Sequence, residues 1–195
     1  MESYQISSWC HHFIKNQVKE GDFCIDATVG NGRDTQVLCT LVGDKGFVYG
    51  FDIQEIALEK TRLKLKEAKL SHRVGLFLKG HEHMANVVEP SHHGKISCVV
   101  FNFGYLPGGD HGLATKGETS ILAMEAALDL LKKDGLISLC LYSGGDSGFE
   151  EREEILAWLR RLDSRQYLVI VNAFYNRGNH PPLPVLIYKL YHSGS

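Results

Sequence analysis

The stretch Cys24-Ile-Asp-Ala-Thr-Val-Gly-Asn-Gly-Arg-Asp-Thr35 decides the fold. A short apolar run ends at Asp26, a tight glycine turn follows at Gly30-Asn31-Gly32, and an amphipathic segment begins at about Arg33. This order predicts a strand, a glycine loop and a helix, which together bring backbone N–H groups and a helix N-terminus against a ligand. The alternative is a glycine turn that only reverses the chain.

A second apolar run, residues 47–51, stops at Asp52, twenty residues beyond Gly32. A carboxylate at the end of the second strand is where an adenosine ribose offers its two hydroxyls. Because Asp26 ends the first strand in the same way, the two strand ends predict a pocket for a nucleoside cofactor.

The kind of cofactor follows from Asp34 and Thr35. Thr35 stands where the dinucleotide fingerprint G-x-G-x-x-G/A needs a small third residue. Asp26 and Thr35 are both candidate cofactor contacts. Asp34, at the start of the helix, would repel a pyrophosphate that the helix dipole otherwise attracts. A carboxylate there suits a phosphate-free ligand with a cationic end, and S-adenosylmethionine (SAM) carries a sulfonium and an ammonium. An NAD-dependent oxidoreductase and a catalytically silent SAM-binding module are the alternatives.

Length and composition limit the class of protein that this chain can belong to. A chain of 195 residues is expected to form a single domain, 1–195, that buries most of its apolar surface. The hydrophobic fraction of 44% and the charged fraction of 23% are typical of soluble proteins, and no apolar run reaches the length of a membrane span. Residues 1–20 lack the apolar core of a signal peptide. We therefore expect no membrane partner.

Cysteine usage and charge bear on the compartment and on nucleic acid. The five cysteines form no C-x-x-C pair and mostly lie in apolar stretches, so we expect buried, reduced thiols in a cytoplasmic protein. The net charge of −2 gives no global signal for nucleic acid. Any RNA contact would come from a local patch, and a homodimer could assemble a basic groove that neither subunit shows alone.

Apolar periodicity predicts alternating strands and helices after a first helix near residues 6–14. The final two strands are joined by a loop too short for a crossover helix, so they must pair antiparallel. The chain is therefore expected to be an α/β protein: a doubly wound, Rossmann-like, seven-stranded, mostly parallel sheet with a C-terminal antiparallel hairpin and helices on both faces. The expected strands are 22–27, 46–51, 74–78, 96–101, 136–142, 167–174 and 185–191, and a helix over 118–133 is expected to close on Lys132 and Lys133.

A second chemical site follows the fourth strand in Asn102-Phe-Gly-Tyr-Leu-Pro-Gly-Gly-Asp110. This strand should neighbour the first, so the run should face the glycine loop. The Asn102 side chain can accept N–H bonds from an amine, leaving the nitrogen lone pair aimed at a methyl group. Tyr105 could stack on a flat base, and Tyr105 and Asp110 are candidates to orient an amine that must lose its proton. The alternative is a Gly/Pro loop that only turns the chain.

The histidines divide by position. His81 and Glu82 follow the third strand, where an adenine edge would lie, and are candidate cofactor contacts. His81 and His83 could instead hold zinc, but no third ligand is near in sequence, and we predict no metal. His11-His12 and His92-His93 are expected to be solvated. Arg177, in the final hairpin loop, is expected to touch substrate.

Five runs occur together in this chain and carry a resemblance: 26–35, 50–54, 80–84, 102–110 and the hairpin loop that ends in Pro181-Pro182. They resemble small class I methyltransferases long labelled rRNA methylases, over about residues 5–190. Members of that family are associated with methylation of tRNA 5-aminomethyl-2-thiouridine at the anticodon wobble position. The same cofactor with a ribosomal RNA base or a small-molecule amine as acceptor is the alternative.

The resemblance implies roles for groups of residues around SAM and the acceptor amine. It also shows a departure, because Phe103 and Gly104 replace the prolines of the Asn-Pro-Pro-Tyr motif that many amine methyltransferases carry. The methionine end would be lined by Gly30, Asn31, Gly32 and Asp34, the ribose and adenosine held by Asp52 and Gln54, the adenine side by His81 and Glu82, and the acceptor by residues 102–110, including Gly104, Pro107 and Gly108.

Overall fold

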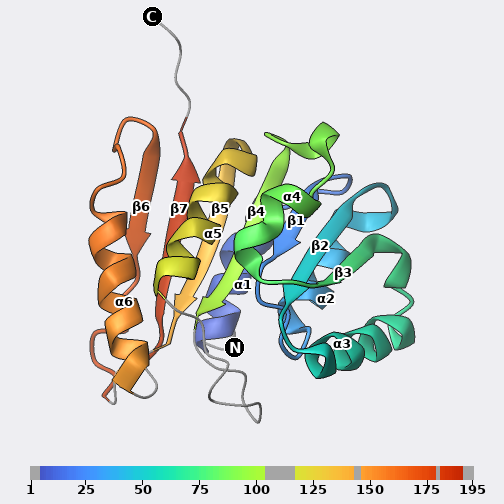
Figure 1. Ribbon diagram of the computed structural model, residues 1–195, viewed down its shortest axis with the longest axis horizontal. Helices are drawn as coiled ribbons and strands as arrows, with labels where there is room; N and C mark the ends of the chain where they lie inside the picture. The colour runs from blue at the N-terminus through green and yellow to red at the C-terminus, as the bar shows by residue number, and fades with distance from the viewer. Residues whose placement is uncertain (1–4, 104–116, 143–145, 179–180, 191–195) are drawn as a thin grey trace, which may run out of the picture.

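The computed structural model describes residues 5–103, 117–142, 146–178 and 181–190. In this part of the chain a seven-stranded sheet runs through the molecule with the strand order β3-β2-β1-β4-β5-β7-β6 (Figure 1). All neighbours pair parallel except for β7, which runs antiparallel to both β5 and β6. The strands are β1 (Phe23–Asp26), β2 (Phe47–Asp52), β3 (Val74–Leu78), β4 (Ile96–Phe103), β5 (Leu131–Leu141), β6 (Tyr167–Val171) and β7 (Leu183–Lys189). The expected sheet and its terminal hairpin are confirmed.

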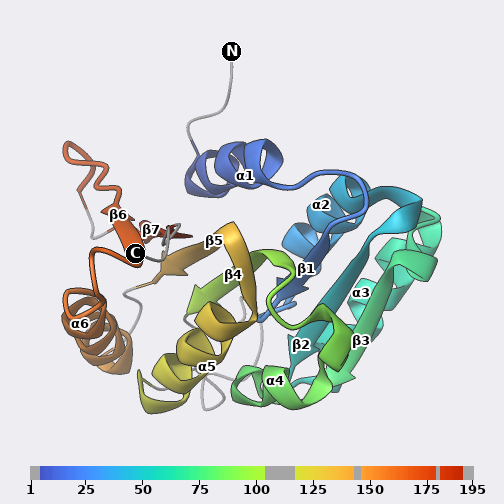
Figure 2. The ribbon, with the colours of Figure 1, turned by 90° about the horizontal axis from the view of Figure 1, so that it is seen from above.

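Helices cover both faces of the sheet (Figure 2). One apolar cluster packs α1 (Ile6–Gln17), α2 (Arg33–Val42) and α3 (Glu55–Glu67) on one face. A larger cluster packs α4 (Met84–Val87), α5 (Gly117–Leu130) and α6 (Asp146–Leu159) on the other. Four short 3-10 turns, η1 (Gly43–Lys45), η2 (Ser71–Arg73), η3 (His81–His83) and η4 (Pro90–His92), lie in the connections. In the described segments, no helix has both the length and the apolar character needed to cross a bilayer.

Strand β4 is buried on both faces, and its pattern shows on which face the Asn102 side chain lies. Side chains alternate between the two faces of a strand. Cys98 and Val100 belong to the α1–α3 cluster, whereas Phe101 and Phe103 belong to the α4–α6 cluster. Asn102 therefore points to the α1–α3 face, and it is the only residue of β4 that is not fully buried.

The ends of several strands meet at one edge of the sheet. The chain order reverses between β1 and β4, and ligands of open α/β sheets bind at the carboxyl edge of such a switch point. The antiparallel register pairs Leu141 with Leu183 and Val171 with Val185, so the loop between β6 and β7 leaves from this same edge. The Arg177 loop and the glycine loop therefore share one edge.

The helix expected over 118–133 ends earlier, at Leu130. Leu131 already pairs with Ile96, and the Nζ of Lys132 donates to Asp22 at 2.7 Å. The two lysines interpreted as a helix end thus begin β5, because strand pairing outweighs the local preference of lysine for a helix C-terminus.

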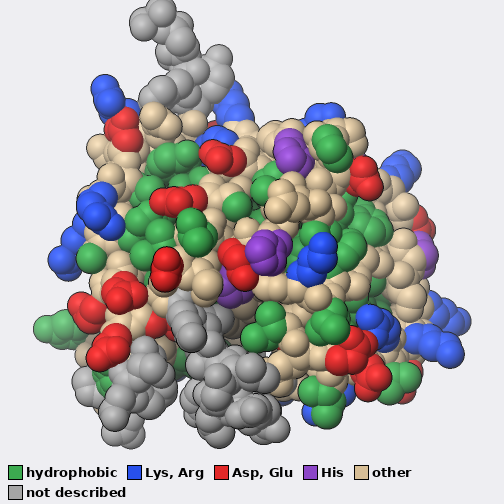
Figure 3. Space-filling model, viewed as in Figure 1, with side chains coloured by type: hydrophobic (Ala, Val, Ile, Leu, Met, Phe, Trp, Pro, Cys, Tyr) green, Lys and Arg blue, Asp and Glu red, His purple; other side chains and the backbone are tan. Residues whose placement is uncertain are grey.

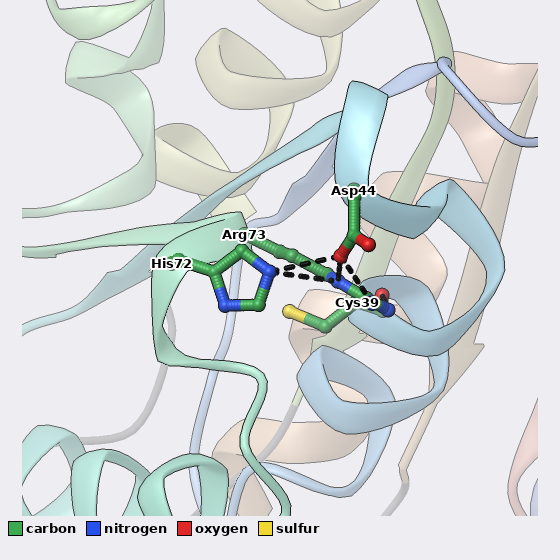
Figure 4. Close-up of polar contacts among 4 residues, drawn as sticks. All are labelled: Cys39, Asp44, His72 and Arg73. Carbon is green, nitrogen blue, oxygen red and sulfur yellow. Dashed lines mark hydrogen bonds and ion pairs between the residues drawn. The ribbon is translucent and has the colours of Figure 1, made fainter.

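At the opposite edge of the sheet, where the parallel strands begin, Arg73 joins neighbouring elements through hydrogen bonds (Figure 4). Arg73, just before β3, donates through Nη1 to the Cys39 carbonyl of α2 at 3.1 Å and through Nε to Asp44 at 2.9 Å. His72 also contacts Asp44, and the hydrogen bonds from His72 and Arg73 lower the pKa of the Asp44 carboxyl. This cluster links α2 to β3 at the far end from the switch point.

Candidate active site

The glycine loop runs between β1 and α2. Gly30 and Gly32 have φ angles of 50° and 68°, a left-handed conformation that side chains disfavour. A Cβ on Gly32 would also lie 2.7 Å from the Cγ2 of Thr61 on α3. Conformation and packing thus both require glycine at Gly32, and the loop keeps an open backbone at the start of α2.

Asp52, at the end of β2, braces this loop. One oxygen of its carboxylate accepts the Gly30 N–H at 2.8 Å, and the other accepts the Gln54 N–H at 2.9 Å. Each oxygen keeps a lone pair for a further donor, and the side chain is only half-buried. The geometry suits a ligand with two adjacent hydroxyls.

Asp26 and Thr35 lie beneath the loop and not on its surface. Both residues are fully buried, the Thr35 hydroxyl donates to the Asp26 carboxylate at 2.6 Å, and the Thr28 N–H donates at 3.2 Å. Burial, with a smaller contribution from nearby Asp34, raises the pKa of Asp26 to about 7. Sequence analysis placed both among the cofactor contacts; the structure makes them supports of the loop, because the first turn of α2 directs Thr35 at the sheet.

This buried acid gives a pH-dependent stability. Its folded pKa of about 7 exceeds the ordinary value of 3.8, so the native state binds the extra proton and loses stability as the pH rises between these values. Between pH 4.5 and pH 8 we expect this loss to be about 3 kcal/mol in the unchanged protein and to be largely absent in Asp26→Asn, which can still hydrogen-bond Thr28 and Thr35. The free energy of unfolding, measured by urea denaturation near pH 4.5 and pH 8, gives this loss of stability. Glu153→Gln, at an exposed position of α6, is the control; parallel pH profiles for Asp26→Asn and the unchanged protein would refute the assignment.

Asp34 links two parts of the site. Its Oδ1 lies 2.5 Å from the Nε2 of His11 on α1, and its Oδ2 accepts the Nδ2 of Asn102 on β4 at 2.7 Å. Burial alone would raise the pKa of Asp34, but the hydrogen bonds from His11 and Asn102 hold it below its ordinary value. The Asn102 N–H donates to the Thr28 hydroxyl at 2.8 Å, so this asparagine is fixed at both backbone and side chain. The expectation that His11 is solvated was wrong.

A small, narrow pocket adjoins this series of hydrogen bonds. Burial raises the pKa of the Tyr142 hydroxyl, and the contact with Cys10 together with burial raises that of the Cys140 thiol, so both are neutral at physiological pH. Sequence analysis predicts buried thiols, Cys10 among them, but does not single out Tyr142. The lining includes Ser7, Cys10, Asp34, Asn102, Ser138, Cys140 and Tyr142. All five cysteines are free and buried, as predicted.

His81 and Glu82 lie on the other face of the same edge. The buried His81 ring packs edge-on against Phe101 and Phe103, with centroids 6.0 and 5.8 Å away, and burial lowers its pKa, so it is neutral. Its Nε2 is buried without a hydrogen-bond partner among the described residues. His83 is exposed and lies 3.6 Å from Glu82. Within the described ranges no cluster of His, Cys, Asp or Glu suits a metal ion.

The other residues singled out from the sequence fall into two groups: those that the structure describes and those that lie outside the described residues. Asn31 is exposed at the loop, and its carbonyl accepts the Nζ of Lys64. Arg177 is exposed, with its guanidinium 4.6 Å from the centroid of the Phe174 ring. His92, expected to be solvated, stacks on Phe23. Gly104, Tyr105, Pro107, Gly108 and Asp110 lie outside the described residues.

Known proteins share this arrangement. A family model described as "Putative rRNA methylase" matches residues 48–188. A crystal structure titled "putative rRNA-methylase" from Clostridium thermocellum is 42% identical and covers 97% of this chain and 100% of its own, with a TM-score of 0.92. A methyltransferase from Streptococcus mutans, solved in complex with SAH, is 32% identical, with coverage of 96% and 99% and a TM-score of 0.86.

A characterised relative comes from Arabidopsis thaliana. This chloroplastic tRNA (mnm(5)s(2)U34)-methyltransferase is 37% identical over 186 residues, which is 91% of this chain and 66% of the plant protein. The chain thus spans slightly less than two thirds of the length of that relative.

The strand order, the glycine loop braced by Asp52 and the asparagine near the end of β4 define a class I methyltransferase. The resemblance in sequence is confirmed by structures that match nearly the whole chain. The chain belongs to the family described as "Putative rRNA methylase".

Proposed function

We propose that this protein is a SAM-dependent N-methyltransferase that acts on the 5-aminomethyl group of a (2-thio)uridine at the tRNA wobble position, giving 5-methylaminomethyl(-2-thio)uridine. One observation carries the acceptor chemistry: the Asn102 amide, fixed by Asp34, lines a small pocket at the switch point. The name of the plant relative supports the choice of tRNA.

The residues around the loop fit SAM. A backbone without side chains at Gly30 and Gly32 leaves room for the methionine end, and the ionised Asp34 complements a cationic ligand. Asp52 offers a lone pair on each oxygen to the two ribose hydroxyls. Gln54, His81 and Glu82 would contact the adenosine. SAM supplies an electrophilic methyl group on a positively charged sulfur.

The protein contributes positioning and dehydration to the transfer. The Asn102 amide nitrogen is engaged by Asp34, so its oxygen is the end that can accept an N–H from the acceptor amine. A neutral amine bound in this way keeps its lone pair free. Buried Cys140 and Ser138 shield one wall of the pocket from water, which favours the neutral amine. The ionised Asp34 in the same lining favours the ammonium form, so a base must take the proton before the transfer. Tyr105 and Asp110 remain our candidates to orient the amine.

The tRNA must be held by a protein with little net charge. On the face seen in Figure 3, the Lys and Arg side chains are interspersed with Asp and Glu. The exposed Arg177 leaves from the catalytic edge and would contact a phosphate there, an interaction that salt weakens. We propose that a homodimer adds further basic surface, and that the protein works in the cytoplasm, where unpaired thiols stay reduced.

Methyl incorporation tests the function. Labelled SAM and the purified protein are incubated with bulk tRNA from a strain that lacks the terminal wobble methylation, and the nucleosides are separated by mass spectrometry. We expect the label in 5-methylaminomethyl nucleosides. Label in ribosomal RNA or in a small amine, with none in tRNA, would refute the tRNA assignment; calorimetry that shows binding of NAD but not of SAM would refute the whole class.

A further inference from the structure

We propose that His11, on the first helix, is a positioning residue of the methyl transfer, acting through Asp34 on Asn102. The proposal rests on the proposed function and adds α1 to the machinery that orients the acceptor. It depends on a continuous chain of short contacts, 2.5 Å from His11 to Asp34 and 2.7 Å from Asp34 to Asn102.

The Asp34 carboxylate determines which atoms donate and which accept in the contacts from His11 to Asn102. An ionised carboxylate only accepts hydrogen bonds, so both of its partners must donate. The Nε2 of His11 therefore carries a proton, and the Asn102 atom that faces Asp34 is the amide nitrogen. The Asn102 oxygen is thereby directed away from Asp34, to where an amine N–H can reach it. Without His11, Asp34 loses the contact that holds one of its oxygens.

The helix that carries His11 is itself firmly placed. Ile14 is buried against the sheet, and the Nε1 of Trp9 donates to Asn172 at 3.3 Å. Gln17 donates to the Asp134 carbonyl at 2.8 Å. Figure 2 shows α1 lying over the sheet near β4 and β5, whose ends line the pocket. The His11 side chain is only 19% exposed, so most of its surface is covered by the protein.

The neighbouring histidine provides a matched control. His12 is exposed, contacts Asn16 at 3.2 Å within α1, and stacks on Trp9 with a centroid distance of 6.3 Å. His12→Ala removes the same side chain from the same helix without touching the chain of contacts to Asn102.

The test separates positioning from folding. In His11→Ala we expect kcat to fall by about 10- to 100-fold, because a loosened Asn102 misplaces the acceptor. The affinity for SAM, measured by calorimetry, should fall much less than kcat, because Asp34 keeps its Asn102 contact while the orientation needed during transfer is lost. His11→Gln, whose amide can donate to Asp34, should recover much of the rate, and added imidazole should partly restore His11→Ala but not Asn102→Ala.

The outcomes distinguish this inference from the proposed function. If the unchanged protein methylates no amine, the proposed function fails. If it is active and His11→Ala matches it, or if His11→Gln and imidazole restore nothing, His11 is not a positioning residue. A loss of rate in His12→Ala equal to that in His11→Ala would also overturn the inference, because it would show damage to α1 in general.

Discussion

Asn102→Ala is expected to lower kcat by about 100-fold or more and to weaken SAM binding much less, because Asp34 keeps its His11 contact. The variant removes the acceptor oxygen that orients the amine, and it also leaves Asp34 without its second donor. Single-turnover transfer from labelled SAM to tRNA measures the chemical step, and calorimetry with SAM alone measures the affinity.

Two further variants sharpen this result. Asn86→Ala, at an exposed position of α4, is the control and should retain full turnover. Asn102→Asp keeps the shape but cannot donate to Asp34, and it sets two carboxylates side by side, so it should be as inactive as the alanine variant. Unchanged turnover in Asn102→Ala would contradict the proposed acceptor site.

Asp52→Ala is expected to weaken SAM binding by about 100-fold. The carboxylate would hold two ribose hydroxyls, each charged hydrogen bond contributing about 1.5–3 kcal/mol, and a tenfold change in affinity is about 1.4 kcal/mol. The variant also releases the N–H groups of Gly30 and Gln54 that Asp52 now holds. Titration calorimetry with SAM reports the dissociation constant.

Asp44→Ala is the matched control for this variant. Asp44 is also bonded to neighbouring polar groups, but it lies with Arg73 at the amino edge of the sheet. We expect it to lower the unfolding midpoint and to leave SAM affinity unchanged. An Asp52→Ala protein that binds SAM as tightly as the Asp44→Ala protein would refute the ribose contact.

Local sequence patterns predicted the main features of the fold and of the cofactor loop. The glycine loop, Asp52 and the terminal hairpin each depend on residues close together in sequence, where turn chemistry and loop length dominate. The position of Asn102 opposite the loop followed from the rule that a fourth strand neighbours the first in this topology, and β1 does pair with β4. These features needed no knowledge of side-chain contacts.

Contacts between distant residues could not be predicted in this way. Cysteine usage predicted a buried thiol at Cys10 but could not show that His11, one position on, contacts Asp34 of α2. A strand-end aspartate can point to a ligand or into the core, and sequence does not distinguish them; Asp26 turns inward because Thr35 offers it a buried donor. Tyr142 was missed because nothing local marks a strand end as a pocket wall.

The contact between Trp9 and Asn172 joins residues 163 positions apart. α1 thus packs on the nearby α2 and also bonds residues that come much later in the chain, at the start of β5 and just after β6. Contacts between residues so far apart in sequence cost more loop-closure entropy than local ones. We therefore expect the pocket beside α1 to be completed late in refolding.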